Sequence, residues 1–436
     1  MGRWRCGPCG LPVSPEHQAA ARAAESAARR SYGKLVALLA SRTRDIAGAE
    51  DALAEAFATA LADWPRGGVP ANPEAWLLTV ARRRLIDVTR RRVQEERTTA
   101  QLLLLSDEAV DPARYELPDV RLGLLFACAH PAIDAAVRAP LMLQAVLGFD
   151  AATIASAFLV APATMGQRLV RAKRRIREAG IALHVPAIDE LQGRLDAVLD
   201  AIYAAYAEGW LNADGTDERR RNLAEEALWL GRLVAALLPG EPEALGLLAL
   251  MLYTDARRLA RRRDAGQDYV PLAEQDPRCW DAAQIDEAEA LLQQAGRAGR
   301  PGRFQLEAAV QSAHSVRRRG EAVDWHAIEQ LYAALAALTA SPVVAVNHAV
   351  ALAQTQGGDA ALVEIDALLG DDRLAGYQPY WAARAELLAR SARRAEAPAA
   401  YQRAIGLERD PAVRRFLQRR SEETSAPDWA GAERKA

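Results

Sequence analysis

Apolar residues recur along this chain at intervals of three and four positions, which is the spacing of one face of an α-helix. We find no convincing alternation of apolar and polar residues of the kind that is typical of a half-buried strand. Ala, Leu, Arg and Glu, all good helix formers, dominate the chain. The pattern therefore predicts an all-α fold, with two small helical domains followed by a longer α-solenoid.

Breaks in the helical pattern divide the chain into segments. The first residues are rich in Gly, Pro and Cys, and the stretch SDEAVDPARYELP, which begins at Ser106, reads as a linker. We expect a disordered lead over residues 1–15, a first helical domain over 16–97, a linker over 98–118 and a second helical domain over 119–185. A helical extension over 186–420 and a loose tail over 421–436 are expected to follow.

The first domain places an acidic helix before a basic one. AGAEDALAEAFATALADW, from Ala47 to Trp64, carries Asp51 and Glu55 on the side opposite its apolar stripe. The stripe consists of Leu53, Ala56, Phe57, Ala60, Leu61 and Trp64. After a Gly/Pro loop, Asn72 is expected to cap the next helix, with Pro73 in its first turn.

The basic helix, NPEAWLLTVARRRLIDVTRRR, has two faces. Leu77, Val80, Ala81 and Val88 are expected to face the core. Thr79, Arg82, Arg83 and Arg90 are expected to face outward, and Trp76 could take either side. Between Arg82 and Arg97 there are seven Arg against three acidic residues, although the whole chain has a net charge of only −2. Such a helix indicates either a nucleic-acid surface or a face that is simply solvated.

The second domain contains the stretch FDAATIASAFLVAPATMGQRLVRAKRRI, which predicts two helices joined by a short turn. Asp150 is expected to cap the first helix, which runs through Ile154 and Phe158, and Pro162 begins the second. On the second helix an apolar stripe (Met165, Leu169, Ala172 and Ile176) opposes a polar face made of Thr164, Gln167, Arg168, Arg171, Arg174, Arg175 and Glu178. This is the pattern of a helix-turn-helix, whose second helix reads the major groove of DNA.

The extension contains a repeated pattern. SPVVAVNHAVALAQTQGGDAALVEIDALL and QPYWAARAELLARSARRAEAPAAYQRAIGL each predict a helix, a short break and a second helix, and Pro342 and Pro379 lie 37 positions apart. That period is close to the roughly 34 residues of a tetratricopeptide (TPR) unit. Stacked helical hairpins leave a concave face that suits a protein or peptide partner.

Other classes of function find little support in the residues. Cys6 and Cys9 form a CxxC pair without a second pair at zinc spacing, and Cys128 and Cys279 suggest no disulfide framework. We expect no metal, no cofactor and no enzymatic activity, because the chain has no P-loop, HExxH or nucleophile-elbow motif. No apolar run approaches the roughly 18 residues of a membrane span, so we expect a cytoplasmic protein.

The order of these motifs is similar to that of a known family. SYGKLVALLASRTRDIAGAEDALAEAFATALADWP, followed by NPEAWLLTVARRRLIDVTRRR, resembles region 2 of bacterial sigma factors of the extracytoplasmic-function (ECF) group of the sigma-70 family. LGFDAATIASAFLVAPATMGQRLVRAKRRI resembles region 4 of the same group. DVRLGLLFACAHPAI and the long helical segment resemble the branch with a C-terminal TPR-like extension, so that the resemblance covers residues 20–420.

The resemblance implies a role for each site. Asp51 and Glu55 would contact the β′ coiled coil of core RNA polymerase, whose β flap is a second implied partner. Promoter DNA would be bound at its −10 element by the loop at Arg66–Ala71 and by Trp76, Thr79, Arg82, Arg83 and Arg90. The −35 element would be bound by Thr164, Gln167, Arg168, Arg171, Arg174 and Arg175. The extension would regulate this sigma factor and could hold a protein or peptide partner.

Two other functions stay open at this stage. One is a helix-turn-helix transcriptional regulator with an effector- or protein-binding TPR-like domain, which would not need the acidic helix at 47–64 or the Arg-rich helix at 76–92. The other is a scaffold whose basic helices are only solvated. Binding to RNA polymerase separates the first from a sigma factor, and salt-dependent DNA binding separates the second.

Overall fold

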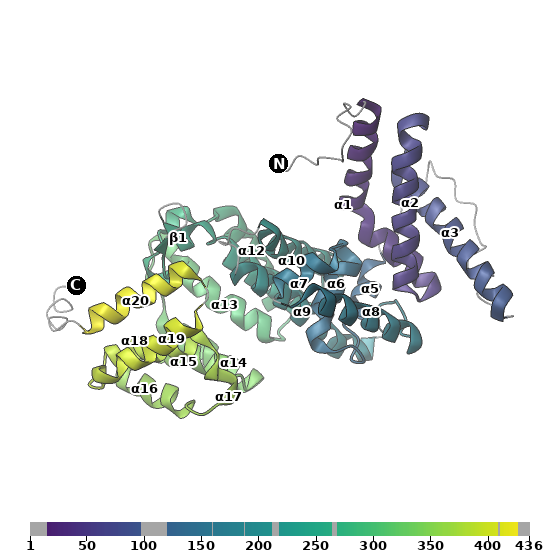
Figure 1. Ribbon diagram of the computed structural model, residues 1–436. Coiled ribbons are helices and arrows are strands. Elements are labelled where there is room, and N and C mark those ends of the chain that lie inside the picture. Colours follow the sequence, from purple (N-terminus) through teal and green to yellow (C-terminus); the bar gives the residue numbers. More distant parts are fainter. Residues whose placement is uncertain are drawn as a thin grey trace. The chain divides into compact units, whose positions relative to one another are not determined.

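The computed structural model of this protein describes residues 15–96, 120–158, 160–186, 188–211, 218–263, 268–408 and 410–425. Within these ranges regular structure is helical, apart from one short antiparallel ladder in which β1 (Arg262–Arg263) pairs with β2 (Asp268–Tyr269) (Figure 1). The predicted all-α fold class is therefore confirmed. The chain divides into two compact units, residues 1–208 and 209–436.

Several predicted segments fall outside the described residues. These are the lead before Pro15, with Cys6 and Cys9, the linker at 98–118 and the end of the tail from residue 426. The start of the predicted tail is helical, because α20 (Pro411–Ser425) continues through it. The expectation of a loose tail from residue 421 is therefore wrong for its first five residues, where Ser421 and Thr424 are buried.

The first unit begins with three helices, α1 (Pro15–Thr43), α2 (Ile46–Gly67) and α3 (Pro73–Glu96). Helices α1 and α2 run side by side, and α3 packs on them and diverges toward its C-terminal end (Figure 1). The core between them contains Leu35, Leu53 and Leu77, each with no exposed area. Asn72 caps α3 as expected, because its side-chain oxygen accepts from the Ala75 N–H at 3.0 Å.

The rest of the first unit is a second group of helices. It consists of α5 (Arg121–Cys128), α6 (Ala135–Leu147), α7 (Ala151–Ala157), α8 (Pro162–Glu178) and α9 (Ile188–Leu211). Helix α5 is buried along its whole length. Arg194 attaches α9 to α5, because its guanidinium donates to the Phe126 carbonyl at 3.1 Å and lies over the Phe126 ring. The first unit thus extends beyond residue 185, where the second domain was expected to end.

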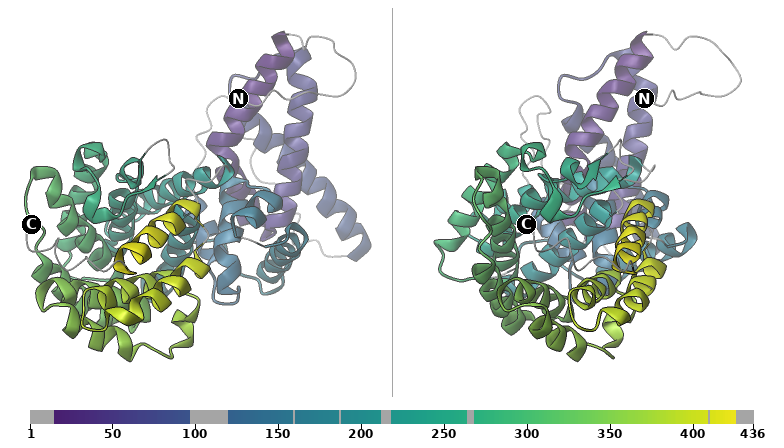
Figure 2. Two further views of the ribbon diagram at one scale, coloured as in Figure 1. Left: turned by 60° about the vertical axis from the view of Figure 1, so that its left-hand side comes forward. Right: turned by 90° about the vertical axis from the view of Figure 1, so that its left-hand side faces the viewer.

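The second unit is a succession of helices. They are α10 (Glu218–Leu237), α11 (Pro242–Asp255), α12 (Ala282–Gly296), α13 (Arg303–Ser315), α14 (Trp325–Thr339), α15 (Pro342–Thr355), α16 (Gly358–Ala367), α17 (Asp372–Ala375), α18 (Gln378–Ala389), α19 (Ala397–Leu407) and α20. Most of them contact the next helix in the sequence, and Figure 2 shows them following one another around a curve. The two predicted helical pairs are present as α15 with α16 and α18 with α19. Their common core includes Ile365, Tyr380 and Tyr401.

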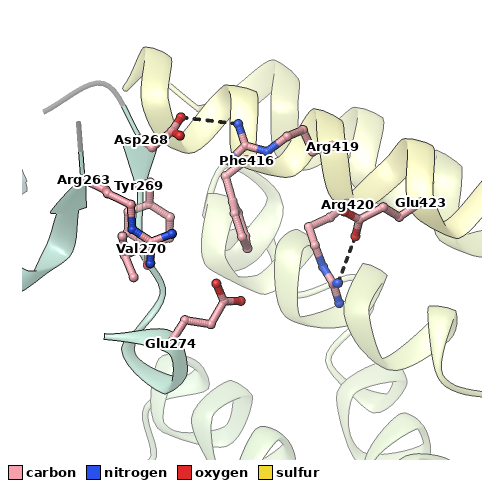
Figure 3. Close-up of a pocket in the computed structure, with 9 residues that line it drawn as sticks. All are labelled: Arg263, Asp268, Tyr269, Val270, Glu274, Phe416, Arg419, Arg420 and Glu423. Atoms are coloured by element: carbon pink, nitrogen blue, oxygen red, sulfur yellow. Dashed lines mark hydrogen bonds and ion pairs between the residues drawn. The ribbon is translucent and has the colours of Figure 1, made fainter. Parts of the chain in front are cut away.

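The last helix returns to the β-ladder within this unit. The rings of Tyr269 and Phe416 lie 5.4 Å apart, and Arg262 forms a largely buried ion pair with Asp410. A small cavity of about 180 Å³ lies between the ladder and α20 (Figure 3). Its lining charges are partly paired with one another, Arg419 with Asp268 at 3.4 Å and Arg420 with Glu423 at 3.1 Å. These contacts attach the C-terminal helix to the start of the unit.

Candidate nucleic-acid interface

Helices α7 and α8 form the predicted pair joined by a short turn. Asp150 caps α7 with bonds of 2.9 Å from the backbone N–H groups of Ala152 and Thr153, and Pro162 occupies the first turn of α8. Helix α7 ends at Ala157, one residue before the expected Phe158, whose N–H still closes the last turn by bonding to the Ile154 carbonyl at 3.0 Å. The Val160 N–H bonds back to the Ala155 carbonyl at 2.9 Å, and a bond of this span ends a helix.

The two faces of α8 are separated as the sequence predicted. Met165, Leu169, Ala172 and Ile176 are buried. Of the six predicted DNA-binding residues, Arg168 is half-buried and the others are exposed, namely Thr164, Gln167, Arg171, Arg174 and Arg175. The Arg174 side chain pairs with Glu178 on the same helix at 3.4 Å. Exposed pairs of this kind contribute only about 0–1 kcal/mol, so a phosphate group can replace Glu178 at little cost.

The predicted −10 surface lies on α3. Trp76 is half-buried, and its ring meets that of the buried Trp64 edge to face at 5.4 Å. The Thr79 hydroxyl donates to the Ala75 carbonyl at 2.8 Å. Arg83 is exposed and Arg82 half-buried, whereas Arg90 lies on α3 with a side chain outside the described residues. These residues share one helix beside the loop that begins with Gly68, whose φ of +83° suits glycine.

The inward face of α3 differs from the expectation in part. Leu77 and Ala81 are buried, but Val80 is half-buried and Val88 is exposed. Leu85 is buried instead, four residues after Ala81. Val88 is exposed because the C-terminal part of α3 diverges from α2 (Figure 1).

The acidic face of α2 carries the predicted polymerase contact. Asp51 and Glu55 are both exposed. Glu55 pairs with Arg84 of α3, whose guanidinium also donates to Glu55 Oε1 at 3.0 Å. Leu61, expected in the apolar stripe, is instead 49% exposed, and Phe57 is half-buried. The buried stripe is narrower than predicted because small residues such as Ala52, Ala56 and Ala60 make the close contact with neighbouring helices.

Comparison with known proteins identifies the region of the chain that contains α2 and α3. The family Sigma-70 region 2 matches residues 28–95, which include the C-terminal half of α1, all of α2 and almost all of α3. The chain belongs to the sigma-70 family. This membership gives it a sigma factor-like role in RNA polymerase binding and transcription initiation.

Other similarities of this sigma-70 family protein carry no description of function. The Family of unknown function (DUF6596) matches residues 194–296. The chain is 40% identical over 372 residues to the uncharacterized protein R00370 of Rhizobium meliloti (strain 1021). The matched residues make up 84% of this chain and 87% of that protein. The two therefore belong to one family. No solved structure matches the chain.

The sigma-70 family protein also has residues beside these surfaces that sequence reasoning missed. Lys173, on α8, is buried and pairs with Glu50 of α2, and Arg177 pairs with Asp45 at 3.3 Å. A signal was present for Lys173, because it stands four residues after Leu169 and three before Ile176, on the apolar side of the helix. Nothing local to either helix could have supplied its partner.

We also searched the described residues of this sigma-70 family protein for metal sites and for membrane-spanning helices. In the part of the chain that the structure describes, no group of three or more His, Cys, Asp and Glu side chains is placed to hold a metal ion. Over the same residues, no helix has both the length and the apolar character that crossing a membrane requires.

Proposed function

We propose that this protein is a sigma factor of the ECF group, which binds core RNA polymerase and directs promoter recognition, and that its C-terminal unit is a TPR-like domain that regulates it. The observation that carries the proposal is the Sigma-70 region 2 match over residues 28–95, on helices that expose an acidic face and a basic face. As a polymerase partner, the protein would act in the cytoplasm.

The polymerase contact is assigned to α2. Asp51 and Glu55 present carboxylates one helical turn apart, and the exposed Leu61 adds apolar area on the same helix. Charged groups that flank apolar area are common at protein interfaces, where the charges favour the correct partner and the apolar side chain loses water. We assign this face to the β′ coiled coil of the polymerase.

The −10 element is assigned to α3 and the loop at Arg66–Ala71. Base stacking on an aromatic side chain contributes about 1–3 kcal/mol per base, and Trp76 is held for such a role by its contact with Trp64. Thr79, Arg82, Arg83 and Arg90 would bind the backbone of the opened strand beside it. This combination favours single-stranded DNA over an intact duplex.

The −35 element is assigned to α8 as duplex. Gln167, Arg168 and Arg171 lie in the first half of the helix, the part that reaches base edges when a recognition helix enters the major groove. Arg174 and Arg175, with Thr164 at the other end, would bind phosphates on either side. The buried stripe of the same helix holds this face in position without using any of its polar groups.

The C-terminal unit is assigned a regulatory role. Its stacked helical pairs suit a protein or peptide partner, which could change how the first unit meets the polymerase, including at the β flap. The alternative is a helix-turn-helix regulator with an effector-binding helical domain, and it predicts DNA binding without polymerase binding.

Co-elution with core RNA polymerase tests the proposal. The full chain and a fragment of residues 1–208 should both be tried, because a cut at Pro186 would remove α9 and its bond to Phe126. The control is the full chain with Asp51→Lys and Glu55→Lys. Both side chains are exposed, and the exposed pair of Glu55 with Arg84 that is lost contributes only about 0–1 kcal/mol, so the fold should stay intact. Co-elution that these changes abolish supports the sigma assignment. If neither form co-elutes while duplex DNA is still bound, the regulator alternative replaces it.

A further inference from the structure

We propose that Val170, on α8, gives the protein a preference for one base of the −35 element, because its two methyl groups pack against the 5-methyl group of a thymine in the major groove. The ligand is thus duplex DNA with a thymine at one defined position. The inference rests on the proposed function, in which α8 binds the −35 element. It adds a preference that hydrogen-bonding groups cannot supply, since a methyl group offers no hydrogen bond.

The Val170 side chain lies on the surface of α8. It is 66% exposed, whereas Leu61, the next most exposed large apolar side chain among the described residues of the first unit, is 49% exposed. Leu169 and Ala172, which flank Val170 in the sequence, belong instead to the buried stripe of the helix. Packing within the described part of the protein therefore does not account for a valine at this position.

Helix stability does not account for Val170 either. The residue stands in the middle of α8, where a β-branched side chain is less favourable than alanine because it loses χ1 freedom against the preceding turn. The same stiffness is useful in binding, since methyl groups already held in one rotamer lose little conformational entropy when a ligand covers them. Single exposed valines are common on protein surfaces, so the residues around this one decide its interpretation.

The residues around Val170 indicate DNA. Gln167 precedes it by three positions and Arg174 follows it by four, so these two exposed side chains share its side of the helix. The Arg171 side chain lies along the helix beside them, since its Nε donates to the Gln167 carbonyl at 3.3 Å. Val170 thus lies within a basic surface that attracts phosphates, and the thymine methyl is the apolar group that the major groove exposes between the phosphates of its two strands.

Short neighbours allow Val170 to reach the base edges. A valine side chain is short, so it touches a base only where the helix itself lies deep in the groove. Ala163 and Gly166 stand seven and four positions before Val170, on the same side of α8. A Cβ added to Gly166 would meet nothing within 4 Å, so no contact in the described structure requires glycine there. A helix with its side chains is about 10–12 Å across and the major groove is about 12 Å wide, so close approach favours small residues along this edge.

Binding to duplexes that differ by one methyl group tests the inference. A preferred −35 duplex is first selected from a random pool by the full chain, with core RNA polymerase present. Each of its thymines is then replaced in turn by deoxyuridine, which removes the 5-methyl group and keeps the base pair. At one thymine the replacement should weaken binding of the wild-type chain about fourfold, the value expected for one buried methyl group. In Val170→Ala the same replacement should weaken binding less than about twofold, because the valine methyl groups that cover this thymine are gone.

Three controls make the test specific. Val363→Ala, on α16, shortens a valine that is 76% exposed in the second unit and should leave both affinities as in the wild-type chain. Gly166→Leu should weaken binding to the thymine and deoxyuridine duplexes alike, by about tenfold or more, because the longer side chain would also hold Gln167 away from its base. The salt dependence of binding should be the same for Val170→Ala as for the wild-type chain, since no phosphate contact is lost.

The possible failures are distinguishable. If a duplex is selected but no thymine separates the wild-type chain from Val170→Ala, the inference is wrong and the assignment of α8 to the −35 element stands. If Val170→Ala instead weakens co-elution with core RNA polymerase and leaves the effect of deoxyuridine unchanged, Val170 belongs to a protein interface and the inference is again wrong. If no duplex is selected at all, the proposed function fails, and this inference fails with it.

Discussion

Gly33→Ala is the most informative perturbation of the first unit, because it should stabilise helix α1 itself and at the same time weaken the contact of α1 with α6. Within α1, replacing a helix-interior Gly by Ala favours the helix by about 1 kcal/mol. Against α6, the new Cβ would stand 2.1 Å from the Val146 oxygen, over 1 Å closer than ordinary contact permits. Overpacking costs about 1–3 kcal/mol, and the upper part of this range applies because the atom met is backbone.

Because α1 is helical whether or not it is packed on α6, the gain in helix propensity cancels in this equilibrium. The contact between α1 and α6 should therefore lose roughly 3 kcal/mol, which is more than about a hundredfold fall in the ratio of packed to separated protein. Hydrogen exchange measures it. Amides at the end of α6 should exchange faster by about that factor, while amides in the first half of α1 should exchange no faster than before.

Gly166→Ala is the matched control. This glycine is also inside a helix, and an added Cβ would meet nothing within 4 Å, so only the gain in helix propensity remains. If Gly33→Ala left exchange at the end of α6 unchanged and stabilised the protein as Gly166→Ala does, the reasoning about a tight fit between α1 and α6 would be refuted.

Three other predictions concern separate parts of the chain. Changing Arg168 and Arg171 to Ala should weaken binding to duplex DNA. The magnitude of the slope of log affinity against log salt concentration should fall by up to roughly 0.9 for each phosphate that is no longer bound, and an unchanged slope would exclude phosphate binding by these residues. Glu243→Ala should lower the unfolding free energy of the second unit by about 1–2 kcal/mol, since Glu243 accepts from the second and third backbone N–H groups of α13, those of Phe304 and Gln305, at 2.9 and 3.1 Å. Glu241→Ala, before α11, is the control, and equal urea midpoints for the two variants would contradict the capping role. Burial, together with the charges of Arg257 and Arg317, lowers the pKa of His314 to about 4, so the unfolding free energy of the second unit should fall by up to about 3 kcal/mol as the pH falls from 6.5 to 4. His314→Gln should remove that part of the pH dependence, and identical pH profiles of urea unfolding for the two proteins would refute the prediction.

Local features of the fold were predictable from the sequence. Asn72, Asp150 and Pro162 mark helix starts that depend only on nearby backbone, and each stands where it was expected. The stripe of α8 was equally predictable, because a helix separates its faces by spacing alone.

Features of the fold that depend on residues far away in the sequence were not predictable. Whether Leu61 and Val88 are covered depends on where the neighbouring helices run, which the apolar pattern of one helix does not specify. Lys173 was on the apolar side by its spacing, but its partner Glu50 is 123 positions away in the sequence. The pairing of Glu55 with Arg84 likewise joins two helices that the sequence could only describe one at a time.

The same difference separates the residues of the candidate site. The described side chains assigned to DNA and polymerase are exposed or half-buried and follow the spacing of their own helices, whereas Lys173 and Glu50, which pair α8 with α2, are largely buried and far apart in the sequence.

Transcription from genomic fragments tests the central claim most directly. Core RNA polymerase is mixed with the purified full chain and with DNA fragments from the source genome, and the 5′ ends of the transcripts are mapped. A sigma factor should produce new starts that share two sequence elements at −10 and −35, and the starts should disappear with Asp51→Lys and Glu55→Lys. Transcripts identical to those of core polymerase alone would contradict the account.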